Sequence, residues 1–178
     1  NLLEQALTIF LFHDVSNNPS EFSRKYNLTT SPDIFLYQLQ FIKNHFNVIS
    51  PDDLLEYKIP KNAALLTFDD GFRSFFTNVI PLLNEYKVPC LILLNMGPIV
   101  KKEMFWAGLI TYLCDKRPDF IQYLNTHIDI EDSSIPLFLF CSENIVNLYL
   151  DEIGESFKDQ VSEFVGEFAN EEDLKQAS

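Results

Sequence analysis

Short apolar runs that end in polar turn residues mark the first half of the chain. The three runs cover residues 7–12, 63–68 and 88–94. The first ends at His13-Asp14 and the second ends at Asp69-Asp70-Gly71. Apolar runs of this length, bounded by turn residues, predict buried β-strands.

Helical patterns lie between these runs. A Ser-Pro pair followed by an acid begins one segment at Ser31 and another at Ser50, and this is the capping chemistry of a helix N-terminus. Apolar residues follow Ser31 at helical spacing as far as Phe46. A helix is also expected over residues 72–86, with an interruption at Pro81 because proline kinks or restarts a helix.

The order of strand, helix and strand predicts a βαβ unit, and therefore a parallel sheet in an α/β fold. From about residue 102 the pattern becomes helical and aromatic, with apolar residues at four-residue spacing from Ile145 to Val165. We therefore expect two parts. Residues 1–101 form βα units that carry the acid pair, and residues 102–178 form a mostly helical insertion.

Composition narrows the class of protein. With 178 residues and 47% hydrophobic residues, the chain is long and apolar enough for a globular domain. The formal net charge of −13 argues against a nucleic-acid partner, because the phosphate backbone would be repelled. There is no run of about 18 apolar residues, so we expect no transmembrane segment.

The adjacent acids Asp69 and Asp70 are the main candidates for chemistry. At a strand end, one carboxylate can accept a proton from water while the other binds a cation that lowers the pKa of that water. Gly71 permits the backbone geometry of such a loop and leaves room for a substrate. By spacing alone, however, Asp-Asp-Gly is a common polar turn that caps the next helix.

A second polar pair, His13-Asp14, follows the first predicted strand. Such a pair is either a hydrogen-bonded structural pair or part of a site, and the spacing leaves both interpretations open.

The segment Thr67-Phe68-Asp69-Asp70-Gly71 resembles the first motif of the polysaccharide deacetylases with the NodB homology domain, carbohydrate esterase family four. Upstream, residues 10–15 are similar to the Tyr-His-x-Val strand end of many members. Downstream, residues 81–94 are similar to the helix and strand that follow the motif. In all, the resemblance covers residues 7–113.

This resemblance implies a role for each site residue. Asp69 would be the general base, and Asp70 would be a ligand of a divalent cation, usually zinc. His13 and Gly71 would line the substrate pocket. The implied substrates are N-acetylated or O-acetylated sugars of a polymer or glycan. The implied fold is the front part of a distorted (β/α)7 TIM-like barrel, with the helical insertion in residues 102–178.

One part of the family pattern is missing from the sequence. The histidines are His13, His45 and His127, with no His-x-x-x-His pair, and the later family motifs are also missing. Residues 170–178 resemble the short helix that precedes the histidine motif. We therefore expect the N-terminal portion of a longer deacetylase, with the remaining metal-ligand histidines beyond Ser178.

Further expectations follow for the fragment itself. It should be inactive, should not bind zinc tightly, and could self-associate through the exposed faces of an incomplete barrel. The alternative is a non-catalytic glycan-binding or scaffolding member of the same fold. The sequence leaves the localisation unknown, and the resemblance favours a bacterial cell-envelope or secreted protein.

Overall fold

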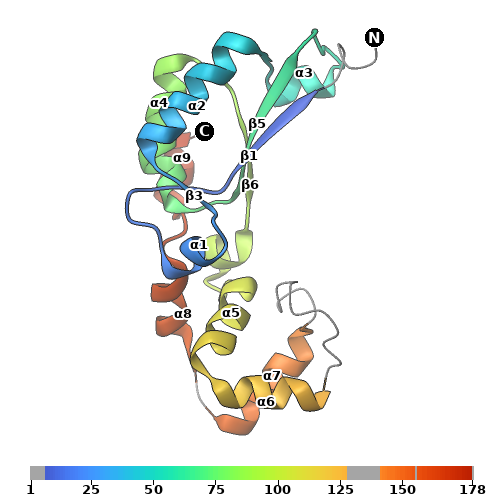
Figure 1. The fold of residues 1–178 in the computed structure, drawn as a ribbon, viewed down its shortest axis with the longest axis vertical. Helices are drawn as coiled ribbons and strands as arrows, with labels where there is room; N and C mark the ends of the chain where they lie inside the picture. The colour runs from blue at the N-terminus through green and yellow to red at the C-terminus, as the bar shows by residue number, and fades with distance from the viewer. Residues whose placement is uncertain (1–6, 128–140, 155, 178) are drawn as a thin grey trace. The chain divides into compact units, whose positions relative to one another are not determined.

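The structure, a computed structural model, describes residues 7–127, 141–154 and 156–177. These residues form two compact units (Figure 1). The first unit comprises residues 7–19, 23–102 and 167–177, and the second comprises the described residues of 20–22 and 103–166.

The first unit is an α/β unit. Its strands are β1 (Thr8–Phe12), β2 (Asp14–Val15), β3 (Thr29–Thr30), β4 (Asn47–Val48), β5 (Ala63–Asp70) and β6 (Leu91–Leu94). Its helices are α2 (Pro32–His45), α3 (Pro51–Leu55), α4 (Ile80–Tyr86) and α9 (Glu171–Ala177), with π-helical turns η2 (Phe75–Val79) and η3 (Gly97–Lys101). Helix α1 (Glu21–Lys25) contains residues of both units.

The main sheet is parallel and is built around β5, which confirms the predicted α/β class. Strand β1 pairs with one edge of β5. Strands β4 and β6 pair with the opposite edge, because Ala64 and Phe68 each have a partner on both sides. Strands β2 and β3 form a separate parallel pair.

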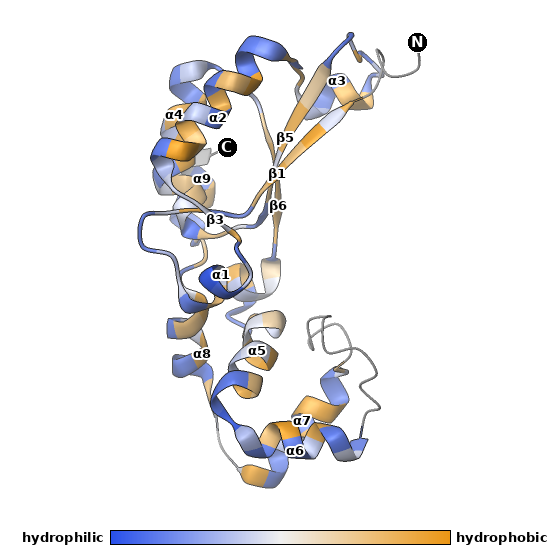
Figure 2. Cartoon of the chain, viewed as in Figure 1, coloured by the Kyte–Doolittle hydropathy of each residue, from blue (hydrophilic) through white to orange (hydrophobic). Residues whose placement is uncertain are grey.

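Aromatic side chains form the core on one face of this sheet. Phe68 at the end of β5 is fully buried, and its ring centroid lies 5.3 Å from that of Phe12 and 4.7 Å from that of Phe75. Helix α2 covers this face with Phe35, whose ring contacts Phe12 edge to face. Figure 2 shows β1 and β5 among the hydrophobic parts of the unit.

The other face of the sheet carries exposed apolar side chains. Ile9, Leu11 and Leu93 are 58%, 54% and 52% exposed. The register pairs Leu11 with Thr67 and Asp69 with Leu93, so these side chains share a face. Asp69 therefore lies at the end of a partly exposed apolar face.

The predicted helix starts are confirmed. The Ser31 hydroxyl accepts a hydrogen bond from the Ile34 amide at the start of α2. Ser50 and Asp53 form a capping box at the start of α3. The predicted interruption near Pro81 is also present, since a π-helical turn, η2, precedes α4 there.

The second unit is helical over its described residues. It contains α5 (Trp106–Lys116), α6 (Pro118–His127), α7 (Glu143–Ile153) and α8 (Lys158–Val165). The apolar stripe from Ile145 to Val165 does not form one helix, because Gly154 adopts φ 65° and ends α7. Within the described part of the chain, no helix has the length and apolar character needed to cross a membrane.

Candidate functional site

Strand β5 delivers two carboxylates to a tight left-handed turn. The first six residues of β5 are buried, and Asp69 and Asp70 end the strand. Asp70 has φ 70° and Gly71 has φ 79°, and the Gly71 amide donates to the Asp69 carbonyl oxygen at 2.9 Å. The carbonyl oxygen of Asp70 accepts from the Asn95 amide at 3.1 Å, which fixes the turn against the end of β6.

Gly71 is required at this turn for two reasons. A positive φ is costly for residues with a Cβ atom. A Cβ atom at Gly71 would also lie 2.8 Å from both Ile99 Cδ1 and Leu94 Cδ2. A side chain at this residue would therefore require the ends of the Ile99 and Leu94 side chains to shift.

Asp69 carries an unpaired oxygen. Its Oδ1 atom is buried and has no hydrogen-bond partner among the described residues. Buried carboxylate oxygens are nearly always hydrogen-bonded, because leaving one unpaired costs free energy. This atom is therefore available to a water, a cation or a donor that the described residues do not supply.

Asp70 lies in a different electrostatic environment. Burial raises the pKa of its carboxyl group, while the nearby His13 opposes that rise and the Asp69 carboxylate adds to it. His13 directly follows β1, and the pairing of Phe12 with Phe68 brings the ends of β1 and β5 together. The structure thus places His13, Asp69, Asp70 and Gly71 at one end of the sheet.

The raised pKa gives a stability prediction for Asp70→Asn. A folded-state pKa above the unfolded value favours folding at low pH, and this contribution is lost as the pH rises through the folded-state value. Ionisation of the carboxyl group with rising pH therefore disfavours the folded chain. Asparagine removes the charge and tolerates positive φ, so we expect a higher Tm at pH 7 in the presence of a chelator.

Asp53→Asn is the matched control for this measurement. The pKa of Asp53 is lowered by hydrogen bonds from the Ser50 side chain and backbone. Its carboxylate therefore favours folding above its unfolded pKa, and the asparagine variant should lower Tm. A fall in Tm for Asp70→Asn would contradict the electrostatic description of this residue.

A C-terminal segment lies against the turn, and the sequence did not predict it. The Ala169 amide donates to the Gly71 carbonyl oxygen at 2.9 Å, and the Phe168 ring stacks on Phe72 with centroids 5.0 Å apart. Arg73 Nη1 lies 2.7 Å from Glu167 Oε2. The opposite charges of Arg73 and Glu167 were the one sequence signal for this contact. Nothing in the sequence indicated that two residues so far apart would pair.

The described residues do not form a complete metal site. Across residues 7–127, 141–154 and 156–177, no group of three His, Cys, Asp or Glu side chains could hold a metal ion. His45 and His127 lie at the ends of α2 and α6, where their Nδ1 atoms contact backbone carbonyl oxygens. A catalytic zinc takes three protein ligands, so Asp70 and its neighbours do not fit the ion by themselves.

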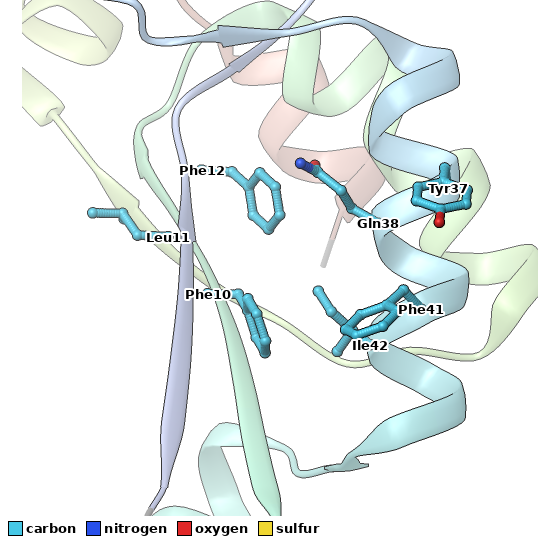
Figure 3. A pocket seen from close by; sticks show the side chains of 7 residues that line it. All are labelled: Phe10, Leu11, Phe12, Tyr37, Gln38, Phe41 and Ile42. Carbon is cyan, nitrogen blue, oxygen red and sulfur yellow. The ribbon is translucent and has the colours of Figure 1, made fainter.

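A separate apolar pocket of about 470 Å³ lies between β1 and α2 (Figure 3). Aromatic side chains dominate its lining: Phe10, Phe12, Tyr37 and Phe41. Gln38 is its one amide, and the Oε1 atom of Gln38 is buried without a partner among the described residues. The pocket lining contains neither acid of the β5 turn.

Comparison with known proteins finds a match over a short segment of the chain. A segment of 31 residues is 48% identical to the poly-β-1,6-N-acetyl-D-glucosamine N-deacetylase of Escherichia coli (strain K12). This segment is 17% of the chain and 5% of that enzyme. The resemblance to polysaccharide deacetylases is confirmed. No family model matches the chain.

Solved structures overlap with parts of the chain. IcaB from Ammonifex degensii has a TM-score of 0.46 and 24% identity over 54% of the chain and 41% of IcaB. The deacetylase PplD from Streptococcus pyogenes has a TM-score of 0.44 and 28% identity over 52% of the chain and 43% of PplD. The chain thus spans less than half the length of either protein.

Proposed function

We propose that the chain is the front portion of a carbohydrate deacetylase that hydrolyses acetyl groups of a sugar polymer or glycan. The observation that carries this proposal is the turn at the end of β5. There, Asp69 has a buried and unpartnered carboxylate oxygen, inside the Thr-Phe-Asp-Asp-Gly segment. The E. coli enzyme of the matching segment is named for removing acetyl from N-acetyl-D-glucosamine units.

In the proposed reaction, Asp69 accepts a proton from a water molecule as the water oxygen attacks the acetamide carbonyl carbon. The tetrahedral intermediate then collapses, the bond between carbon and nitrogen breaks, and the proton held by Asp69 passes to the nitrogen. The products are a free amine and acetate. General base catalysis of this kind needs a carboxylate within reach of the water, and the unpaired oxygen of Asp69 supports that role.

We further propose that Asp70 is one ligand of a divalent cation, zinc by the family resemblance, and that His13 and Gly71 border the substrate. By the same resemblance, the other ligands would be histidines beyond Ser178. Such an ion would polarise the carbonyl and lower the pKa of the water when bound.

The finer fold assignment is part of the same proposal. Strands β1, β5 and β6 would be neighbouring strands of a distorted (β/α)7 barrel, and the helices of residues 102–178 would be its insertion. The parallel pairing and the helices α2 and α4 on one face of the sheet support this assignment. The exposed Ile9, Leu11 and Leu93 are then the apolar surface through which an incomplete barrel could self-associate.

The test is hydrolysis of β-1,6-linked N-acetylglucosamine oligomers by the full-length protein that contains this chain. We expect acetate and free amine in equal amounts, loss of activity with a chelator, and recovery with zinc. Acetate without amine from an O-acetylated xylan oligomer would assign an ester substrate instead. A full-length protein that releases no acetate from either oligomer, but binds them, would favour the non-catalytic glycan-binding alternative.

A further inference from the structure

Asp14 is a buried carboxylate that joins three separate segments of the first unit. Its residue is 6% exposed. Its Oδ1 atom accepts a hydrogen bond from the Ser74 hydroxyl at 2.6 Å, and its Oδ2 atom accepts one from the Thr29 hydroxyl at 2.9 Å. Both carboxylate oxygens are therefore satisfied by hydroxyl donors, one just after the β5 turn and one in β3.

The backbone next to Asp14 is held by the same segment of chain. The Val15 amide donates to the Ser74 hydroxyl oxygen at 3.3 Å, and the Asn78 side-chain amide donates to the Val15 carbonyl oxygen at 2.8 Å. Ser74 and Asn78 are four residues apart and so lie on one side of the helical segment that follows the turn. Strand β2 is thus fastened to the segment that begins three residues after Gly71.

These contacts fix the chain on both sides of His13. On one side, Phe12 pairs with Phe68, the residue before Asp69. On the other side, Asp14 is bound to Ser74, four residues after Asp70. His13 therefore lies between two attachments to the strand and the helical segment that flank the acid pair.

We propose that Asp14 is a positioning residue, whose buried carboxylate holds His13 in place beside Asp69 and Asp70. The expected effect of Asp14 on catalysis rests on the proposed deacetylase function. Its expected effect on the position of His13 does not. A substrate between His13 and the acids would need their separation held within a fraction of an ångström, because a misplacement of about 1 Å can cost about 10²-fold in rate. A merely structural Asp14 would stabilise the fold without affecting the His13 ring.

The structural part is tested by the His13 ring signal in the full-length protein with labelled histidine. The ring correlation of His13 is assigned by comparison with His13→Gln, and those of His45 and His127 serve as internal references. We expect Asp14→Ala to move the His13 correlation and to leave the two references unchanged. A His13 correlation that coincides with that of the wild type would overturn the proposal.

Two further variants keep this test decisive if Asp14→Ala does not fold. Ser74→Ala removes one hydroxyl donor from Asp14 and the acceptor of the Val15 amide, so it should also move the His13 correlation. Thr111→Val removes a buried hydroxyl of the second unit, which donates to the Ala107 carbonyl oxygen at 2.6 Å. This control should lower Tm and leave the His13 correlation unchanged.

The catalytic part is tested by deacetylation kinetics. We expect Asp14→Ala to lower kcat by about 10-fold to 100-fold with little change in KM, and Thr111→Val to leave both unchanged. Asparagine has the same shape and can still hydrogen-bond both hydroxyls, so Asp14→Asn should keep most of kcat. Equal losses in Asp14→Asn and Asp14→Ala would overturn the positioning role, because the charge would then be the effective property.

The two hypotheses fail in different ways. If the wild-type protein releases no acetate, the proposed function fails, and the His13 ring measurement still decides the role of Asp14. If acetate is released and Asp14→Ala does not move the His13 ring correlation, the proposed deacetylase function is supported and the positioning role of Asp14 is wrong.

Discussion

Replacing Asp69 by asparagine should lower kcat for acetate release by the full-length protein by about 10²-fold to 10⁴-fold. Asparagine keeps the shape of the side chain and one carbonyl oxygen, but it cannot accept a proton from the attacking water. The substrate contacts are unchanged, so KM should change little, and the loss should be the same in kcat and kcat/KM. Acetate release at saturating oligomer concentration measures the effect.

Asp33→Asn is the control, because Asp33 is an exposed acid in the first turn of α2. It changes the net charge of the chain by the same amount, and it should leave kcat at the wild-type value. Circular dichroism and Tm of both variants show whether the fold is intact. A kcat for Asp69→Asn above about a tenth of the wild-type value would assign the base to another residue, since general base catalysis contributes at least about 10²-fold.

The unpaired oxygen of Asp69 also shows what kind of information the sequence lacks. The sequence showed the acid pair and its position after an apolar strand. It also showed that the pair is either a polar turn or part of a functional site. Whether a partner satisfies the carboxylate depends on every side chain that reaches the end of β5. That environment appears only when β1, β5 and β6 are brought together in space.

Local signals predicted the elements that position the turn. Serine caps and apolar periodicity predicted α2, and the apolar run over residues 63–68 predicted β5 and the parallel sheet. The exact strand ends were predicted less well. Strand β6 covers only Leu91–Leu94 of the apolar run over residues 88–94. Helix propensity also did not reveal the break at Gly154, where the chain takes the left-handed conformation that glycine permits.

Contacts between residues far apart in the sequence could not be predicted from local sequence patterns. Asp14 and Ser74 are 60 residues apart, and Arg73 and Glu167 are 94 residues apart. A hydroxyl or a carboxylate has many possible partners in a chain with 26 acidic residues. The topology selects one partner for each, so the network around the turn follows from the fold and not from spacing.

The aromatic core beneath the turn gives the largest stability prediction. Phe68 is fully buried beside Asp69, and its ring lies close to those of Phe12, Phe35 and Phe75. Phe68→Ala should lower the free energy of unfolding by about 3–5 kcal/mol, because it removes buried apolar surface and leaves a cavity. Urea unfolding should show a lower midpoint with an unchanged m-value.

Phe41→Ala separates the effect of burial from that of losing any phenyl ring. Phe41 is 47% exposed on α2, and its ring stacks on His45 at 4.2 Å. Its replacement should cost only about 1 kcal/mol, the usual value for a point substitution. Equal losses in the two variants would mean that the ring of Phe68 does not carry the packing of the β5 end, and that the position of Asp69 depends on the backbone turn alone.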